Sequence, residues 1–355
     1  MKDSTKYAGV DVHPASCRFH VRSNGGRREL ECTVPTTETA ILELLRSIGG
    51  RIVVAFEEGS QSEWLYRLLR PVVAEVIVCN ARENRSGRGK SKSDKIDAEQ
   101  LSLWLYKGVL KPVYHEDHGT GRLRHLVHIY EQLVSDRSRS KNRLKAIYHS
   151  RAIGVRGAAV YGAARRGQWM AQLPDDGART RARLLVEQID QVKKLITEAK
   201  REMVAEVRTH PAYLALTSIP GIGDVRASQL IATIRTPMRF RRNRQLWAYG
   251  GLAVVMDGSG EIEYVDGRPQ RRKGASRTRG LTKSCNHRVK SALKGAAMTA
   301  ASSGGLKPYY DRLLARNLAP ELARVTLARK IATLVLVLWK KGERFDVAKL
   351  ENKTV

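Results

Sequence analysis

Four acidic residues in the first hundred positions have the spacing expected of a metal-assisted site. Asp11 lies between two valines of an expected strand, where a carboxylate is costly unless it is paired or binds a cation. Glu57 directly follows a short apolar run. Asp94 and Asp97 are three residues apart at the start of an expected helix, so they share one of its faces. If the four converge, their hard oxygen atoms suit Mg²⁺.

A site of this kind would act on a phosphodiester. Two Mg²⁺ ions about 3.5–4 Å apart could bind both the attacking and the leaving oxygen. A simpler interpretation of Asp94 and Asp97 is a charged helix start that the helix dipole favours. Glu58 adjoins Glu57, and the register of the expected strand favours Glu57 as the ligand.

Ser259 stands between two glycines and is sterically accessible. A serine hydroxyl can act as a nucleophile, but a Gly-Ser-Gly segment by itself is more often a turn. No His–Asp pair is spaced to suggest a hydrolase triad.

Positive charge is the strongest compositional signal. Lys and Arg number 64 against 35 Asp and Glu, a formal net charge of +29, which predicts a polyanionic partner. Basic residues are dense in 82–95, 137–166 and 268–294, and the last two tracts contain no acidic residue. Such tracts suit the phosphates of RNA and DNA equally, and the first is also consistent with an ordinary solvated loop. The basic residues expected to bind nucleic acid are Arg85, Arg88, Lys90, Lys92, Arg137, Arg139, Lys141, Arg143, Lys145, Arg271, Arg272, Lys273, Arg277, Arg279, Lys283, Arg288 and Lys290.

The elements of the N-terminal third follow from its hydrophobic patterning. Strands are expected at 7–13, 17–22, 28–34, 52–56 and 76–79, with helices opening at 36–39 and spanning 63–69. Three strands in a meander, followed by alternating helix and strand, is the order of a ribonuclease-H-like α/β domain. We therefore expect this fold to bring the four carboxylates to one end of its sheet.

The remaining two thirds are expected to be mainly helical. Long helices are predicted at 123–152 and 180–207. The second has an apolar, heptad-like stripe consistent with self-association or with ordinary packing, formed by Leu184, Leu185, Ile189, Val192, Leu195 and Ile196. The turn 174–177 separates them. Ile219 to Gly223 resembles a helix-hairpin-helix element, in which Gly221 and Gly223 let backbone amides approach a phosphate, although a plain helix turn has the same pattern. Residues 279–293 are expected to form a basic helix or its approach, and 322–339 a core helix.

Other classes of protein are excluded by composition. Four cysteines show no paired spacing, so neither a zinc finger nor a disulfide framework is expected. The longest apolar run, 331–339, is far below the about 18 residues of a membrane-spanning helix. A length of 355 residues predicts two or three domains.

These motifs together resemble the DEDD-type insertion-sequence transposases of the Piv-invertase type, a family of bridge-RNA-guided serine recombinases. The resemblance is carried by YAGVDVH around Asp11, VAFE ending at Glu57, and KSDKIDA containing Asp94 and Asp97. In the second half it is carried by SIPGIG, RF at 239–240, WAYGGL, GSG at 258–260 and RGLTKSCNHRVK. The resemblance covers nearly the whole chain in the family's order.

The resemblance implies a division of labour among three regions. It implies a RuvC-like domain at 1–115 with Mg²⁺ on the four carboxylates, a helical coiled-coil linker at 116–210, and a transposase domain at 211–355. It assigns the DNA-attacking serine to Ser259, with Ser276 and Ser284 as lesser rivals in the same basic tract. It further implies a guide RNA, target and donor DNA, a homo-oligomer between dimer and tetramer with composite active sites, and a cytoplasmic, nucleoid-associated bacterial protein.

Two interpretations from other classes stay open. In a metal-only nuclease resembling a Holliday-junction resolvase, the carboxylates perform all the chemistry and Ser259 is a turn residue. In a non-catalytic RNA- or DNA-binding protein, both sites are degraded.

Overall fold

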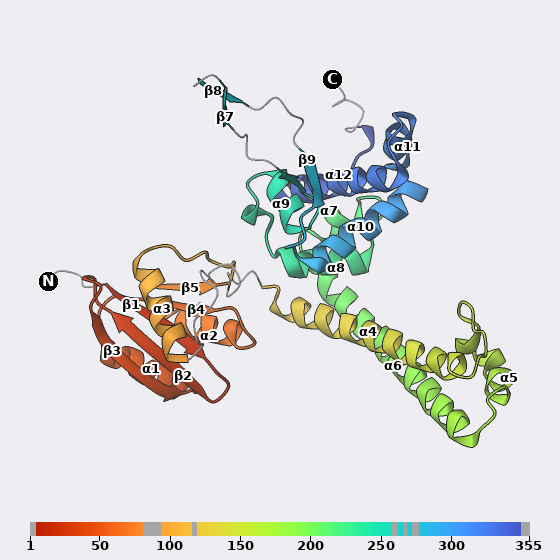
Figure 1. Cartoon of the computed structure of the whole chain (residues 1–355), viewed down its shortest axis with the longest axis horizontal. Coiled ribbons are helices and arrows are strands. Elements are labelled where there is room, and N and C mark those ends of the chain that lie inside the picture. Colours follow the sequence, from red (N-terminus) through yellow and green to blue (C-terminus); the bar gives the residue numbers. More distant parts are fainter. Residues whose placement is uncertain are drawn as a thin grey trace. The chain divides into compact units, whose positions relative to one another are not determined.

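The computed structural model describes residues 5–80, 94–115, 119–257, 262–265, 268–271 and 277–348 (Figure 1). The backbone alone is described for 94–96, 256–257, 262–265, 271 and 277. The chain divides into two compact units, Met1–Glu116 and Asp117–Val355, and each is considered by itself.

A five-stranded mixed sheet forms the centre of the first unit. Its strand order is β3-β2-β1-β4-β5, with β1, β4 and β5 parallel and the first three strands joined as antiparallel neighbours. The predicted strands are confirmed with small changes of boundary: β1 (Lys6–Val12), β2 (Ser16–Arg22), β3 (Arg28–Pro35), β4 (Ile52–Glu57) and β5 (Glu75–Cys79).

Helices cover both faces of this sheet. Side chains alternate between faces along each strand, so Val10, Phe19 and Phe56 pack with α1 (Glu38–Ile48) and α2 (Ser62–Leu69). Val53 and Ala55 face the other way and pack against Leu105 of α3 (Asp94–Tyr106). Thr37 caps α1 through its side chain, as the threonine-rich helix start predicted.

Helix α3 lies unusually close to β1 because of Gly9. A Cβ built on Gly9 would collide with the carbonyl oxygen of Ala98 and the amide nitrogen of Ser102, both backbone atoms of α3. Glycine is therefore required for this contact, and the position of α3 depends on it.

Replacing Gly9 with alanine is expected to destabilise the first unit by about 2–3 kcal/mol, because α3 must move away from β1. Gly25→Ala is the matched control, since the nearest atom to its added Cβ is Ser23 Oγ at 3.8 Å. Urea unfolding followed by circular dichroism measures both variants. Equal loss of stability in the two would contradict the close approach at Gly9.

Two long antiparallel helices open the second unit: α4 (Gly121–His149) and α6 (Asp176–Arg208). Leu123 and Val127 near the start of α4 pack into the same core as Met203 and Val207 near the end of α6. Between the helices lie η1 (Ala159–Tyr161), η2 (Ala163–Arg165) and α5 (Arg166–Ala171). The long helices predicted here are confirmed.

The buried face of α6 differs in part from the expected stripe. Ile189 and Ile196 are buried as predicted, whereas Leu184 and Leu195 are exposed. The buried residues of α6 recur at spacings of three, four and seven: Ala178, Ala182, Val186, Ile189, Ile196, Met203 and Val207. Leu184 and Leu195 fall between these positions in the helical period, so their side chains lie outside the buried face.

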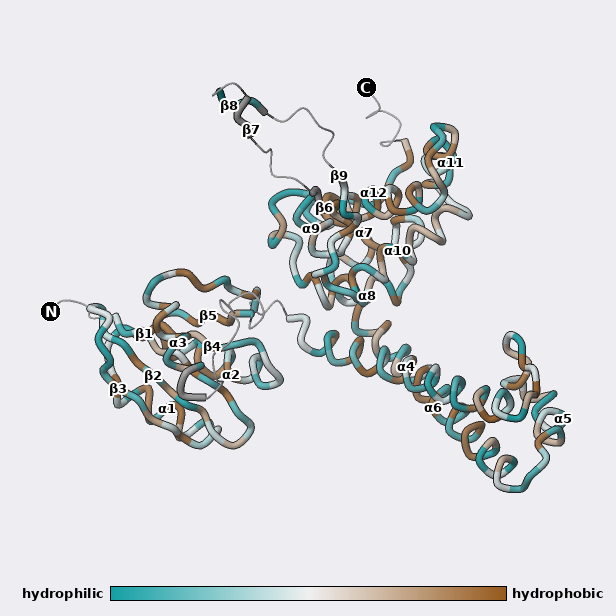
Figure 2. Tube along the Cα trace, viewed as in Figure 1, coloured by the Kyte–Doolittle hydropathy of each residue, from teal (hydrophilic) through white to brown (hydrophobic). Residues whose placement is uncertain are grey.

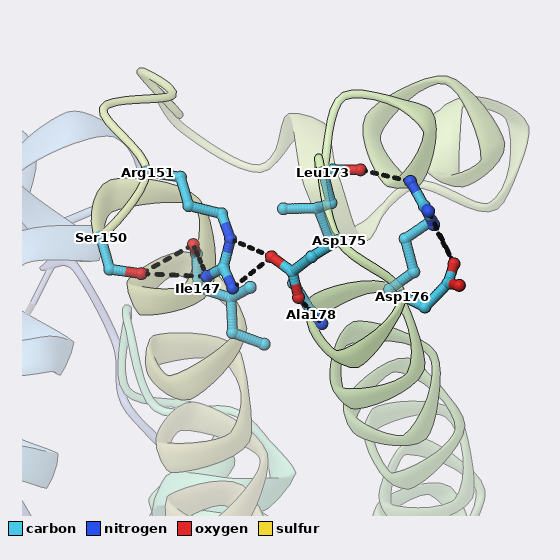
Figure 3. Close-up of polar contacts among 8 residues, drawn as sticks. Ile147, Ser150, Arg151, Leu173, Asp175, Asp176 and Ala178 are labelled. Carbon is cyan, nitrogen blue, oxygen red and sulfur yellow. Dashed lines mark hydrogen bonds and ion pairs between the residues drawn. The ribbon is translucent and has the colours of Figure 1, made fainter.

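Polar contacts join the C-terminal end of α4 to the N-terminal end of α6 (Figure 3). Arg151 donates from Nε and Nη2 to Asp175 Oδ2 at 3.0 and 2.7 Å, while Asp175 Oδ1 accepts the N–H of Ala178 at 2.7 Å. These bonds hold the pKa of Asp175 below its usual value, the backbone bond being the larger cause and Arg151 the second. The segment predicted as the turn 174–177 is thus corrected: Asp175 is the N-cap and Asp176 and Gly177 already belong to α6.

A helical bundle forms the rest of the second unit. Its helices are α7 (Tyr213–Thr217), α8 (Asp224–Ile234), η3 (Pro237–Arg239), α9 (Asn243–Tyr249), α10 (His287–Ser302), α11 (Lys307–Ala315) and α12 (Pro320–Lys341). Ile231, Leu293 and Ile331 belong to its fully buried core. Hydrophobic residues recur along α12, whereas long hydrophilic stretches run along α4 and α6 (Figure 2).

Two small sheets within 254–281 were not expected from the sequence. β6 (Val254–Asp257) pairs with β9 (Arg277–Leu281), and β7 (Ile262–Val265) pairs with β8 (Arg268–Arg271). Residues 279–281 therefore belong to a strand, and the helix predicted within 279–293 begins at His287. No helix in the described part of the chain has the length and apolarity to cross a membrane.

Candidate active site

Asp11 and Glu57 lie at the ends of two adjacent parallel strands. The last paired residues of β1 and β4 are Val10 and Phe56, so Asp11 and Glu57 occupy the next position on each strand. Both alternate onto the face that α3 covers. A hollow of about 160 Å³ is lined by both residues and by Glu58. The sheet edge thus brings together two of the predicted carboxylates.

The direction of α3 brings its first turn toward the same sheet edge. Ala98 and Ser102 lie over Gly9, whereas the ring of Tyr106 packs edge-on against Tyr7 with 5.6 Å between centroids. Helix α3 therefore runs opposite to β1, and its N-terminal end lies toward the strand end that carries Asp11.

The other two predicted carboxylates lie in that first turn. Asp97 is exposed, and for Asp94 the structure describes the backbone alone, as the first residue of α3. Within the described residues, no group of three His, Cys, Asp or Glu side chains is close enough to hold a metal ion. The four-carboxylate site therefore stays a prediction. It is supported by the shared face of Asp11 and Glu57 and by the direction of α3.

Two residues beside Asp11 were not identified as site residues by the sequence analysis. His13 Nε2 lies 3.1 Å from Asp11 Oδ2. Arg18 is the cross-strand partner of Asp11 and shares its face, and it donates from Nη2 to Glu31 Oε1 at 2.6 Å. Arg18 Nε is buried and has no hydrogen-bond partner among the described residues. Only the strand register could have shown that Arg18 lies beside Asp11.

A polar cluster fixes α3 against β2 on this face. Ser102 Oγ lies 2.8 Å from Nδ1 of the buried His20 and accepts from Arg22 Nε at 3.1 Å. Burial lowers the pKa of His20, and the nearby Arg22 charge lowers it further. His20 is thus favoured in its neutral form, in which it can pair with Ser102.

Two of the candidate serines lie outside the described residues: Ser259, between β6 and β7 in sequence, and Ser276, between β8 and β9. Ser284 is exposed and precedes α10. The role of Ser259 therefore stays a prediction, and so does the choice among the three serines.

Positive charge gathers where α4 meets η1. The ammonium groups of Lys141 and Lys145 lie over the ring of Tyr161, at 4.7 and 5.6 Å from its centroid. Burial lowers the pKa of Lys141, and the charges of Arg137, Lys145 and Lys193 add to the effect. Like charges held this close indicate a surface suited to phosphate groups.

Replacing both Lys141 and Lys145 with glutamine is expected to weaken RNA and DNA binding. The slope of log K against log salt should fall in magnitude by about one for each phosphate that the variant no longer binds. Arg183→Gln is the matched control, since Arg183 already pairs with Glu187 at 2.7 Å. Fluorescence anisotropy at several salt concentrations measures the slopes. Unchanged slopes in the double variant would remove this surface from the interface.

The glycine hairpin before α8 has one inward and one outward glycine. Gly221 has φ +87°, and a Cβ there would collide with the carbonyl oxygen of Ala296 in α10, so this glycine serves packing. Gly223 is the N-cap of α8, and a Cβ there would meet no atom within 4 Å. Of the two predicted phosphate-binding glycines, Gly223 has the more open surroundings.

The other predicted nucleic-acid contacts have diverse surroundings. Arg288 donates from Nε to Glu131 Oε2 at 2.8 Å, and Glu131 also accepts from Gln229, so this group links α10, α4 and α8. Arg139 and Arg143 are exposed, as are Arg279 and Lys283. Lys290 Nζ lies 4.0 Å from Cys285 Sγ. Only the backbone is described for Arg271 and Arg277, and the rest lie outside the described residues: Arg85, Arg88, Lys90, Lys92, Arg272 and Lys273.

The aromatic motifs of the second half are structural in this unit. The guanidinium of Arg239 lies over the rings of Phe240 and Tyr249, and it donates to the carbonyl oxygens of Thr233 and Ile234. Trp247 Nε1 donates to the carbonyl oxygen of Arg329 at 3.1 Å. These motifs therefore contribute to the packing of the helical bundle.

Comparison with known proteins identifies the class. A DEDD-type transposase family of the IS110 group matches residues 8–149, a range that contains all four predicted carboxylates. The transposase family IS116/IS110/IS902 matches residues 213–311, which contain the glycine hairpin and Ser259. Both domains of one transposase class are thus found in one chain, in order.

A curated relative agrees with this class. An uncharacterized 43.6 kDa protein of insertion element IS110 from Streptomyces coelicolor is 25% identical over 156 residues. The match covers 42% of this chain and 35% of the relative, so it spans about a third of that protein's length. The chain belongs to the IS110 family of transposases.

Proposed function

We propose that this chain is the transposase of an insertion sequence, a DNA recombinase of the Piv-invertase type that cuts and rejoins target and donor DNA. The observation that carries the proposal is the placement of Asp11 and Glu57 on one face at one sheet edge, toward which the first turn of α3 also lies. The strand order β3-β2-β1-β4-β5 supports a RuvC-like assignment for this domain.

The carboxylates fit a divalent cation by the chemistry of their donors. Asp11 and Glu57 offer hard oxygen atoms beside a hollow of about 160 Å³, and Asp94 and Asp97 begin the helix whose start lies toward that edge. DEDD-type transposases are typically metal-dependent. When bound, one or two Mg²⁺ ions polarise the scissile phosphate and stabilise the leaving oxygen.

Ser259 supplies the nucleophile in this proposal. Its Oγ forms a bond to phosphorus as the bond from phosphorus to the deoxyribose 3′-oxygen breaks. The hydroxyl proton leaves Oγ, and the departing 3′-oxygen takes up a proton, giving a 5′-phosphoserine linkage and a free 3′-OH. One phosphoester replaces another, so rejoining to a new 3′-OH needs no ATP.

Nucleic-acid selection is assigned to a guide RNA. The chain has a net charge of +29, and no zinc finger is legible in its sequence. We infer that basic residues such as Lys141 and Lys145 hold RNA and DNA backbones while base pairing selects the sequence. Target and donor DNA are each paired with one loop of the RNA. A homo-oligomer, dimer to tetramer, brings the carboxylates of one protomer to Ser259 of another.

Sequencing the RNA that co-purifies with the full chain from its own host tests guidance. The proposal expects one discrete RNA species encoded next to the gene. A heterogeneous RNA population that follows cellular abundance would contradict guidance and favour a general nucleic-acid-binding protein.

A further inference from the structure

Buried polar atoms without a hydrogen-bond partner are rare in folded proteins, and each calls for an explanation. Among the described residues of this chain they occur in Arg18, His115 and Thr233. Both ring nitrogens of His115 lack a hydrogen-bond partner, and its side chain is only 6% exposed. A small movement of a neighbouring polar side chain would therefore give a ring nitrogen of His115 a hydrogen-bond partner.

The backbone holds His115 firmly next to Glu58. Val113 donates its N–H to the carbonyl oxygen of Val78 at 2.6 Å, which aligns the stretch 112–115 with the end of β5. Glu58 donates its N–H to the carbonyl oxygen of Cys79 at 2.8 Å, so it is tied to the same strand end. As a result, His115 Nε2 lies 3.6 Å from Glu58 Oε1. A small rotation of the Glu58 side chain closes this gap to a hydrogen bond.

The two adjacent glutamates have different surroundings. Glu57, the last residue of β4, alternates onto the α3 face with Asp11, whereas Glu58 follows the strand. Glu58 is close to His115, whose ring lies 5.6 Å from that of Tyr66 in α2. Both glutamates nevertheless line the same hollow as Asp11, so Glu58 is within reach of the site unless it is held away.

We propose that His115 is a positioning residue that holds Glu58 on the α2 side, so that Glu57 is the glutamate that binds the divalent cation with Asp11. The inference rests on the proposed carboxylate site and decides between its two adjacent glutamates. Residues that orient the groups around a metal ligand change metal affinity roughly 10- to 100-fold when they are replaced.

Titration calorimetry of the full chain with Mn²⁺ tests this assignment. We expect Glu57→Gln to weaken Mn²⁺ binding roughly tenfold or more, and Glu58→Gln to change it less than about twofold. His115→Phe releases Glu58, so Glu57→Gln combined with His115→Phe should bind roughly tenfold more tightly than Glu57→Gln alone. Adding Glu58→Gln to that pair should remove the recovery. His115→Gln keeps an amide donor for Glu58, so combining it with Glu57→Gln should give no recovery of Mn²⁺ binding.

The outcomes separate this inference from the proposed function. Asp11→Asn should also weaken Mn²⁺ binding roughly tenfold or more. If it does not, the carboxylate site and the role of His115 are both wrong. If it does, but Glu57→Gln with His115→Phe binds no tighter than Glu57→Gln, the role of His115 alone is overturned. If Glu58→Gln and Glu57→Gln weaken Mn²⁺ binding equally, the proposed role of His115 is also overturned.

Discussion

Replacing Ser259 with alanine is expected to abolish the covalent protein–DNA adduct and to lower strand rejoining by roughly 10⁴-fold or more. The reason is that without Oγ no phosphoserine linkage forms, so the energy of the broken phosphoester is not conserved. Electrophoresis of end-labelled DNA under denaturing conditions, with Mg²⁺ present, measures adduct and product together.

The neighbouring serines provide matched controls. Ser276→Ala and Ser284→Ala change the same kind of residue within the same basic tract, and both should keep adduct and product. If Ser259→Ala continued to cut DNA as fast as the unchanged chain, the carboxylates would be performing all the chemistry. The protein would then be a metal-only nuclease of the resolvase kind.

Replacing Asp11 with asparagine is expected to lower DNA cleavage by roughly 10³-fold while the fold stays intact. Asparagine has nearly the same shape, but it removes the negative charge that a divalent cation requires at the end of β1. Single-turnover cleavage in Mg²⁺ measures the effect, and thermal unfolding checks the fold.

A carboxylate away from the site serves as the control for Asp11. Glu29 lies on β3 and pairs with Lys6 at 3.3 Å, so Glu29→Gln should leave cleavage unchanged. Cleavage and recombination that persist in Asp11→Asn would contradict a metal-assisted reaction at this site.

The sequence predicted the first unit well because its signals are local. The continuous apolar run at 52–56 identified a central strand, and the threonines at 36–37 marked the start of α1. Asp11 and Glu57 could be placed near each other because each follows an apolar strand segment, and adjacent parallel strands end at the same edge.

Other features depended on information that no local pattern contains. Arg18 lies beside Asp11 through strand register, and His115 reaches Glu58 from a distant part of the chain. Leu184 and Leu195 belonged to the predicted stripe of α6, but the buried face includes Ala178 and Ala182 instead, and a pattern of large apolar residues does not identify buried alanines. The strands within 254–281 are only four or five residues long, and β8 and β9 consist largely of polar residues, so this segment lacks the extended alternation that predicts a strand.

Mapping the covalent adduct at residue resolution gives the decisive test of whether both halves of the chain act on one phosphodiester. The full chain is incubated with DNA and Mg²⁺, digested with protease, and the DNA-linked peptide is identified by mass spectrometry. We predict a nucleotide linked to Ser259, formed only with the divalent cation and lost in Asp11→Asn. An adduct on another residue, or one at Ser259 that forms equally well in Asp11→Asn, would contradict the account.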